Sequence, residues 1–217
     1  MTLTGCGEDA DSGLVQLLER VADVDFPTLG HFLEHGFADL SVRRFGLPQR
    51  VIGIAATLAL DEPDAGSVNR AILELRPGDV LVIDTGGDHA HAVIGAVTAA
   101  AARARGAAGI LVDGAVTDVG ALGDPRSGIP VHARGTSCLT TKQLGGTKGR
   151  RQVPVDIGGV RVEPGDVILG DASGVIALPP DALAAVLPCA ELSDEREPAL
   201  LRRIADGEAL EKLLYLG

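Results

Sequence analysis

Two aspartates, Asp84 and Asp113, each follow a short apolar run of the kind that forms a buried strand. If both runs belong to one parallel sheet, the two carboxylates lie at the same edge of it. In open α/β sheets that edge, beside helix N-termini with free N–H groups, is where anionic ligands and metal ions usually bind. The pattern therefore predicts the location of a site and leaves the reaction open.

The residues from Gly78 to Asp118 read as a strand, a glycine turn, a helix and a second strand. Thr85 to Asp88 can form a tight turn because glycine reaches positive φ at little cost. The alanine-rich composition from about Ala92 to Arg105 predicts a helix, which Gly106 would end. This length suits a crossover between parallel strands, the second of which would end at Asp113.

The composition argues against a nucleic-acid partner. The formal net charge is −11, whereas proteins that bind nucleic acid gather Lys and Arg to displace counterions from phosphates. Aromatic residues make up 2% of the chain and Trp is absent, so stacking on bases is also poorly supplied. Because 46% of the residues are hydrophobic, we expect a sizeable core of Val, Leu, Ile and Ala.

The chain of 217 residues predicts one domain with terminal extensions. Residues 1–13 are rich in Gly, Asp and Ser, and we expect them to form a flexible leader. Residues 14–217 are expected to form a single domain. Its C-terminal extension is predicted to be helical from about Asp181 and to be broken near Pro188 and Pro198.

Several further acids stand at predicted turns. The segment from Val167 to Leu178 predicts a β-hairpin, and Asp166 and Asp171 are expected to hold its turns. Asp113 is expected to cap the turn at Gly114 in the same way. These acids are therefore assigned to the fold rather than to chemistry.

The cysteines and the apolar runs indicate a compartment. Cys6, Cys138 and Cys189 lie far apart, which suits a reducing environment better than a disulfide scaffold. The first residues lack the basic region and apolar run of a signal peptide, and no apolar run reaches the length of about 18 residues that spans a membrane. We expect a cytoplasmic protein with no membrane partner.

An ordered set of short motifs resembles the RraA-like family over roughly residues 25–210. That family includes regulators of ribonuclease E activity, 4-hydroxy-4-methyl-2-oxoglutarate aldolases with oxaloacetate decarboxylase activity, and proteins mislabelled as demethylmenaquinone methyltransferases. The motifs are Val51-Ile52-Gly53, Pro77-Gly78-Asp79-Val80, Arg105-Gly106, Asp113-Gly114, Thr117-Asp118, Gly158-Gly159-Val160, Pro164-Gly165-Asp166 and Gly170-Asp171-Ala172-Ser173-Gly174-Val175.

The resemblance implies a fold and a reaction. The fold is an α/β, swivelling β/β/α domain with a central mixed sheet and helical N- and C-terminal segments. It would assemble as a homotrimer or hexamer with the active site between subunits. The reaction is cleavage of a small anionic substrate, a 2-oxo acid, with a divalent metal cation, Mg²⁺ or Mn²⁺. Such a hard cation would bind the carboxylate and keto oxygens and stabilise the enolate.

The resemblance also assigns roles to individual residues. The metal-binding aspartate of the family corresponds to Asp118. The backbone amides that hold the oxo acid correspond to Gly95, Ala96, Val97 and Thr98 at a helix N-terminus. Glu197 aligns with an acid that approaches a neighbour's metal site, although an exposed helix charge is an equally good interpretation of it.

Two positions depart from the family pattern. Thr117 stands where the family has an arginine that binds the substrate carboxylate, and Ala96 stands where it has an acid. Loss of such an arginine should cost a few kcal/mol of binding, and loss of the acid removes a group for handling a proton. Arg126, Arg134 or a neighbouring subunit could supply an arginine instead.

Two histidines precede the predicted substrate-binding turn. His89 or His91 could act as a base, or as a nitrogen ligand that shifts metal preference towards zinc, iron or manganese. Three functions follow. The first is a metal-dependent lyase with altered specificity. The second is a non-catalytic, protein-binding regulator of the ribonuclease E inhibitor type. The third is a repurposed enzyme of the same fold that uses His89 or His91.

Overall fold

The computed structural model describes residues 6–142 and 148–214. Their contacts define two compact units: residues 6–34 with 181–214 form unit 1, and residues 35–142 with 148–180 form unit 2. The predicted α/β class with a central mixed sheet is confirmed. No helix in the described ranges is long and apolar enough to cross a membrane. The predicted division into a leader, 1–13, and a single domain, 14–217, stays a prediction.

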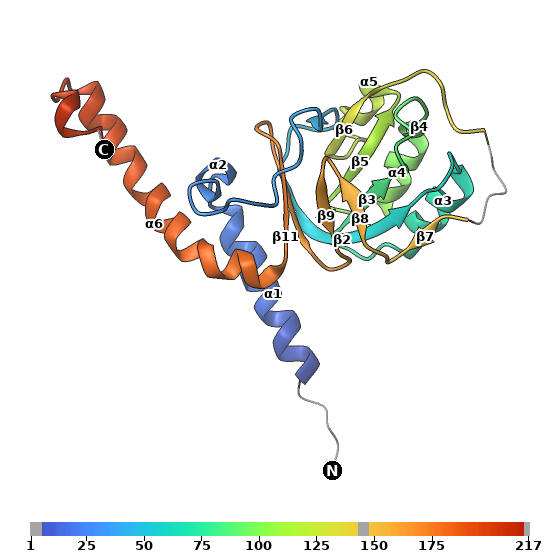
Figure 1. Cartoon of the computed structure of the whole chain (residues 1–217), viewed down its shortest axis with the longest axis horizontal. Coiled ribbons are helices and arrows are strands. Elements are labelled where there is room, and N and C mark those ends of the chain that lie inside the picture. The colour runs from blue at the N-terminus through green and yellow to red at the C-terminus, as the bar shows by residue number, and fades with distance from the viewer. Residues whose placement is uncertain (1–5, 143–147, 215–217) are drawn as a thin grey trace, which may run out of the picture. The chain divides into compact units, whose positions relative to one another are not determined.

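Unit 2 is built on a mixed sheet (Figure 1). Within the described residues it has nine strands: β1-β6-β5-β3-β2-β10-β11 in that order, with β4 beside β5 and β7 beside β2. β2, β3, β5 and β6 run parallel, and β10 and β11 extend the sheet antiparallel. The strands are β1 (Arg43–Arg44), β2 (Val51–Ala59), β3 (Asp79–Asp84), β4 (Ala92–Ile94), β5 (Gly109–Val116), β6 (Val131–Thr136), β7 (Arg150–Arg151), β10 (Val167–Gly170) and β11 (Val175–Leu178).

Both faces of the central strands are buried, which explains the continuous apolar run of β3. Leu81 and Ile83 pack with residues of the helices α3 (Ala65–Glu74) and α4 (Ala96–Ala104). Val80 and Val82 point to the opposite face, because successive side chains of a strand alternate. There they pack with a separate hairpin, β8 (Val155–Ile157) and β9 (Val160–Val162).

The helix predicted from Ala92 to Arg105 is shorter than expected. Ala92–Ile94 forms β4, which pairs in parallel with the end of β5, and α4 begins only at Ala96. Val93 and Ile94 are buried, and two adjacent β-branched residues suit a pleated, buried edge better than a helix. Tertiary pairing therefore overrides the local helix propensity of this segment.

The prediction that the second strand ends at Asp113 is wrong. β5 continues to Val116, so Asp113 lies inside it, level with Asp84 of β3. The strand continues through a β-bulge: between Val112 and Ala115 it advances three residues while β6 advances two, from Ala133 to Gly135. Asp84 ends β3 as predicted.

The predicted hairpin is confirmed as β10 and β11, paired antiparallel from Val167↔Leu178 to Gly170↔Val175. Both turn acids have the expected role. Asp166 accepts the N–H of Glu163, and Asp171 accepts the N–H of Ser173. Such bonds from a carboxylate to a nearby backbone N–H stabilise turns.

Unit 1 is helical, with α1 (Cys6–Ala22), α2 (Phe26–Leu29), α6 (Pro180–Ala205) and a short 3₁₀ helix, η1 (Leu210–Lys212). α1 runs without a break from Cys6 to Ala22. α6 continues through Pro188 and Pro198, so the predicted breaks are wrong. Around Pro188, the buried side chains Leu183, Leu187 and Ala190 and the ion pair from Glu191 to Arg20 of α1 hold the helix in place.

Candidate active site

The end of β5 meets the beginning of α4. The N–H of Thr117 donates to the carbonyl of Ile94, and the N–H of Ala96 donates to Oδ2 of Asp118 at 2.9 Å. Asp118 then begins the short helix α5 (Val119–Leu122). The structure thus brings together, at one place in unit 2, five of the residues assigned by family resemblance: Gly95, Ala96, Thr98, Thr117 and Asp118.

Local backbone geometry explains two of these residue types. Asp118 has φ +55° and ψ +41°, a left-handed conformation that aspartate adopts more readily than most residues. Gly95 leaves no room for a side chain: a Cβ there would lie 2.7 Å from Oδ2 of Asp118 and 2.9 Å from Cγ2 of Thr117. The glycine therefore permits the close approach of α4 and Asp118.

The four amides predicted to hold the oxo acid are not equivalent. The N–H of Gly95 donates to Oγ1 of Thr98 at 2.9 Å, and that of Ala96 is taken by Asp118. The N–H groups of Val97 and Thr98 lie in the first turn of α4, where a helix provides no acceptor. These two remain to bind an anion, with the helix dipole in their favour.

No arginine of the described chain contacts Asp118. Arg126 bonds to Asp124 of its own loop, with Nη2 to Oδ2 at 2.8 Å. Arg134 bonds to Asp113 instead, with Nε to Oδ1 at 2.8 Å. Neither of the two candidates within the chain therefore replaces the arginine that Thr117 lacks.

The donor set fits a hydrated, hard cation. Asp118 is exposed and keeps one carboxylate oxygen, Oδ1, outside the bond to Ala96. Within the described residues, no three His, Cys, Asp or Glu side chains cluster so as to hold a metal ion. Mg²⁺ usually keeps several waters and binds through one or two carboxylates and its substrate. A single exposed aspartate is therefore a suitable protein ligand for such a hydrated ion.

The two histidines lie at another place in unit 2. His91 precedes β4, and the extended chain from there to Gly95 spans about 13 Å at 3.3 Å per residue. Nδ1 of His91 lies 2.6 Å from Oδ2 of Asp88. Burial alone would raise the pKa of Asp88, but hydrogen bonds from the N–H groups of Ala90 and His91 and from the imidazole outweigh it and lower that pKa.

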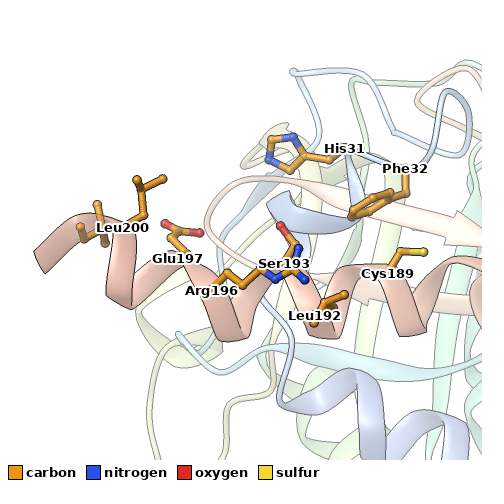
Figure 2. Close-up of a pocket in the computed structure, with 9 residues that line it drawn as sticks. His31, Phe32, Cys189, Leu192, Ser193, Arg196, Glu197 and Leu200 are labelled. Atoms are coloured by element: carbon orange, nitrogen blue, oxygen red, sulfur yellow. The ribbon is translucent and has the colours of Figure 1, made fainter. Parts of the chain in front are cut away.

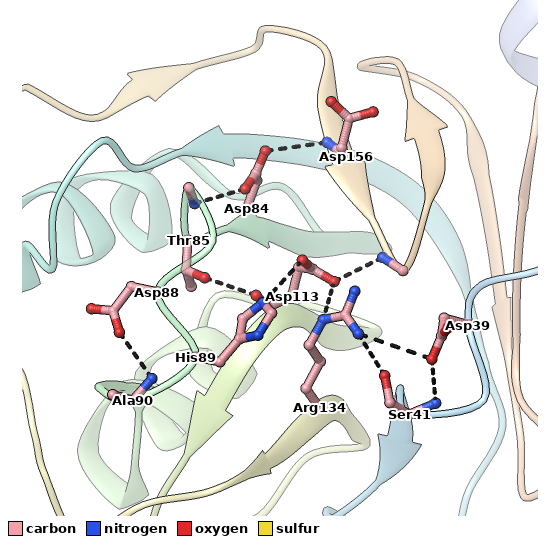
Figure 3. Close-up of polar contacts among 12 residues, drawn as sticks. Asp39, Ser41, Asp84, Thr85, Asp88, His89, Ala90, Asp113, Arg134 and Asp156 are labelled. Carbon is pink, nitrogen blue, oxygen red and sulfur yellow. Dashed lines mark hydrogen bonds and ion pairs between the residues drawn. The ribbon is translucent and has the colours of Figure 1, made fainter.

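His89 belongs to a cluster around Asp113 (Figure 3). Its Nε2 lies 3.7 Å from Oδ2 of Asp113, while Oδ1 of the same carboxylate accepts Nε–H of Arg134 and the N–H of Gly158. Asp113 is only 8% exposed. It therefore does not cap the turn at Gly114 as predicted, because its carboxylate reaches away from that turn to β6 and to the β8–β9 hairpin.

Asp84 plays a related part in the fold (Figure 3). Its Oδ1 accepts the N–H of Gly86, and its Oδ2 accepts the N–H of Asp156 in β8. The two aspartates predicted to mark a ligand site thus both bind the β8–β9 hairpin. The sequence carried a signal for the pair of acids, but none for the partners of Asp113. Arg134 and Gly158 follow Asp113 in the chain by 21 and 45 residues.

Glu197 lies in unit 1 and lines a groove of about 640 Å³ on α6 (Figure 2). Its neighbours in the groove include His31, Phe32, Arg196 and Leu200. The groove has an apolar floor and a few charged groups. Whether Glu197 meets a metal site stays a prediction.

The comparison with known proteins identifies the family and covers the segment that carries the candidate site. A family model described as RraA-like, Aldolase/RraA, matches residues 21–177, which is most of the chain. The chain belongs to the RraA-like family. The match includes the whole Gly95–Asp118 site, whereas α6 and Glu197 lie beyond it.

RraA-like relatives differ in what their names say. A protein of Halalkalibacterium halodurans, provisionally named a 4-hydroxy-4-methyl-2-oxoglutarate aldolase, is 36% identical over 76% of this chain and 80% of its own length. A Burkholderia mallei protein of the same provisional name is 38% identical over 62% and 78%. The solved structure titled RNA-processing inhibitor RraA from Thermus thermophilis is 30% identical, with a TM-score of 0.64 over 72% of this chain and 93% of its own.

A further solved structure supports the fold alone. The structure of an uncharacterized Pseudomonas syringae protein covers 98% of this chain and 96% of its own, with a TM-score of 0.78 and 24% identity. At family level the names favour a lyase.

Proposed function

We propose that this RraA-like protein is a lyase that requires Mg²⁺ or Mn²⁺ and cleaves a C–C bond of a small 2-oxo acid. The observation that carries the proposal is the contact of the Asp118 carboxylate with the Ala96 amide at the N-terminus of α4. The exposed Asp118 carboxylate, the metal ligand of this proposal, thus lies beside the first turn of α4, where the N–H groups of Val97 and Thr98 have no acceptor within the helix. A carboxylate, such as that of a 2-oxo acid, can bind both to a hard cation and to the N–H groups at a helix N-terminus.

The chain's own residues divide the work. Asp118 would hold the cation, and the N–H groups of Val97 and Thr98 would orient the substrate carboxylate. When bound, a divalent cation supplies an electrophile that stabilises negative charge on the keto oxygen as the C–C bond breaks. Without a cation, the negative charge of Asp118 would repel an anionic substrate, since no arginine offsets it. Metal dependence should therefore be strict.

The absence of an acid at Ala96 favours decarboxylation over aldol cleavage. Loss of CO₂ from oxaloacetate breaks the C–C bond without removing a proton from the substrate. Aldol cleavage needs a base to take the proton of the hydroxyl group. No such base lies in contact with Asp118 among the described residues of unit 2. The specificity would thus differ from that of family members that keep the acid and the arginine.

We also propose that the protein assembles as a homotrimer or hexamer, so that Glu197 of one copy completes the metal site of a neighbour. The family resemblance supports this, together with the small number of metal ligands at Asp118 in a single chain. No nucleic-acid or membrane partner is proposed. Measuring the mass of the assembly in solution tests the oligomeric state. Comparing the Mn²⁺ affinity of Glu197→Gln with that of the parent protein tests the role of Glu197.

Oxaloacetate decarboxylation tests the proposed function. We expect turnover with Mg²⁺ or Mn²⁺, none with a chelator, and none in Asp118→Asn. Asparagine tolerates the left-handed backbone and keeps an oxygen for the Ala96 N–H, so this variant removes only the charge. A folded, assembled protein without turnover under these conditions would refute the proposal.

A second candidate is a repurposed enzyme that uses the pair Asp88 and His91. The distance of 2.6 Å between Oδ2 and Nδ1 fixes the imidazole and leaves Nε2 free to accept a proton, as in a general base. This candidate predicts activity that survives Asp118→Asn and is lost in His91→Gln. A protein that lacks both activities but binds a basic protein would instead be the regulator.

A further inference from the structure

Asp113 and Asp118 lie on one chain segment, on either side of the β-bulge in β5. The extra residue falls between Val112 and Ala115. Because successive side chains of a strand face opposite sides, one extra residue exchanges the faces of every residue that follows. The bulge thus decides the side on which Thr117 and Asp118 emerge from the sheet.

The bulge is held by polar bonds of the residue at its centre. The backbone carbonyl of Asp113 accepts Oγ1–H of Thr85 at 2.7 Å. Its side-chain Oδ1 accepts Nε–H of Arg134 at 2.8 Å and the N–H of Gly158 at 2.7 Å. Arg134 is itself held by a hydrogen bond from Nη1 to Oγ of Ser41. Both the backbone and the side chain of Asp113 are therefore fixed.

The backbone next to the bulge lies close to the side chain of Thr85. A Cβ at Gly114 would lie 2.7 Å from Cγ2 of Thr85 and 3.0 Å from its Oγ1. Thr85 thus both bonds to Asp113 and packs against the following residue. Only glycine therefore fits at position 114 beside Thr85.

Beyond the bulge, β5 pairs with β4 on one side and with β6 on the other, and the N–H of Thr117 donates to the carbonyl of Ile94. The side chain of Asp118 is exposed and has one bond, to the Ala96 N–H. Its left-handed backbone is also a conformation that depends on its surroundings. The register in which β5 meets β4 after the bulge therefore decides where the Asp118 carboxylate stands.

We propose that Asp113, paired with Arg134 and bonded by Thr85, is a positioning residue that sets where the Asp118 carboxylate stands relative to α4. It acts through the bulge and does not touch substrate or metal. The inference rests on the proposed function only in that Asp118 is the metal ligand. Its structural part, the coupling from Asp113 to the Asp118–Ala96 bond, is independent of any reaction.

The structure offers a matched control. Asp84 is level with Asp113 in the neighbouring strand and also binds the β8–β9 hairpin, through the N–H of Asp156. Among the described residues, its side chain bonds to Gly86 and Asp156 and not to residues 112–115. Asp113→Asn and Asp84→Asn each remove one carboxylate charge at the same level of the sheet, but only the first weakens the bulge. Asp84 is half-buried and Asp113 is buried beside Arg134, so thermal unfolding is measured for both variants to separate a loss of stability from a loss of positioning. Thr85→Val, which keeps the side-chain shape and removes the bond to the Asp113 carbonyl, is a second bulge variant.

The experiment measures Mn²⁺ binding to the full chain and hydrogen exchange of the Ala96 amide, alongside thermal unfolding. Partners that orient a metal ligand typically contribute 10- to 100-fold to metal affinity. We expect Asp113→Asn and Thr85→Val to weaken Mn²⁺ binding by about tenfold or more and to speed exchange at Ala96. Asp84→Asn should leave both within about twofold, whatever it does to the melting temperature.

Three outcomes would overturn the inference. Equal effects of Asp84→Asn and the bulge variants would reduce Asp113 to a general stabilising residue. Unchanged Mn²⁺ binding and exchange in a folded Asp113→Asn would show that the bulge does not reach Asp118. An unprotected Ala96 amide in the parent protein would remove the bond that the inference requires. If the parent protein binds no Mn²⁺, the proposed function fails, while the exchange data alone still decide the positioning.

Discussion

Two aspartates five residues apart in one segment have opposite surroundings. Asp113 is buried, and its polar atoms bind Arg134, Gly158 and Thr85. Asp118 is exposed, and its side chain has a single bond to a backbone amide. A buried carboxylate must have its charge and lone pairs satisfied by the protein, whereas an exposed one can keep an oxygen for a ligand. The difference separates an acid that builds the fold from one available for chemistry.

The largest expected effect is a loss of stability when the buried aspartate, Asp113, is replaced. Asp113→Ala leaves Arg134 with only its bond to Ser41 and its longer contact to Asp39, 3.9 Å from Nη1 to Oδ1, and it leaves the Gly158 N–H without an acceptor. Removing one partner of a largely buried pair should lower the free energy of unfolding by about 3 kcal/mol, whereas Asp118→Asn should change it by less than about 0.5 kcal/mol. Urea denaturation of both variants measures this. Equal losses would mean that the two acids are not distinguished by burial.

The next effect concerns the exposed half. In Gly95→Ala, the new Cβ would meet Oδ2 of Asp118 at 2.7 Å and displace it. A ligand shifted by this much should lower metal-dependent turnover by about 10- to 100-fold with a smaller change in stability. Gly120→Ala is the control, because nothing lies within 4 Å of a Cβ at that position. Parallel losses of turnover in the two variants would contradict the role of Gly95.

Thr117→Arg should improve substrate binding at the exposed site, because it adds a positively charged side chain beside Asp118. A charge-assisted hydrogen bond contributes about 1.5–3 kcal/mol, so kcat/KM for oxaloacetate should rise by about tenfold or more. Thr117→Gln, a long side chain without the charge, should give no such gain. Steady-state kinetics at saturating Mn²⁺ measure kcat/KM for both variants and for the parent protein. A fall in kcat/KM for the arginine variant alone would show that the substrate carboxylate is bound elsewhere.

The smallest expected effect is a change in the pH dependence of stability, caused by a second buried polar group beside β5. His132 is 1% exposed and bonds through Nε2 to the carbonyl of Asp171, while its ring packs against Gly170. Burial lowers the pKa of His132; the bond to Asp171 opposes this and the charge of Arg44 adds to it. The unfolded chain therefore takes up the proton first as the pH falls.

The sign of that pH dependence follows. Stability is full above pH 6.5, the ordinary value for histidine, and falls as the pH drops towards the lowered pKa of the folded state. The slope should approach, at most, about 1.4 kcal/mol per pH unit. In His132→Gln this dependence should disappear between about pH 5 and 6.5, as measured by urea denaturation at each pH. An unchanged slope in the variant would exclude His132 as its source.

The sequence carried much of the fold because its signals were local. The buried runs of β3 and β5, the hairpin of β10 and β11, and the turn acids Asp166 and Asp171 are all found where the pattern placed them. The errors fell where distant contacts decide. Ala92–Ile94 is a strand because β5 lies beside it, and α6 passes Pro188 where its buried side chains and the ion pair to Arg20 of α1 hold it. Propensity cannot register a partner that is far away in the chain.

The same division holds for the site. By itself the sequence determined the residue types: glycine at position 95, alanine at 96, threonine at 117, and aspartate at 118, which tolerates a left-handed backbone. Only the tertiary structure decided that β5 runs on past Asp113 through a bulge, and that Arg134 binds Asp113 rather than standing in at Thr117. The reason is that a buried charge must find its counter-charge in three dimensions, and sequence spacing does not encode that choice.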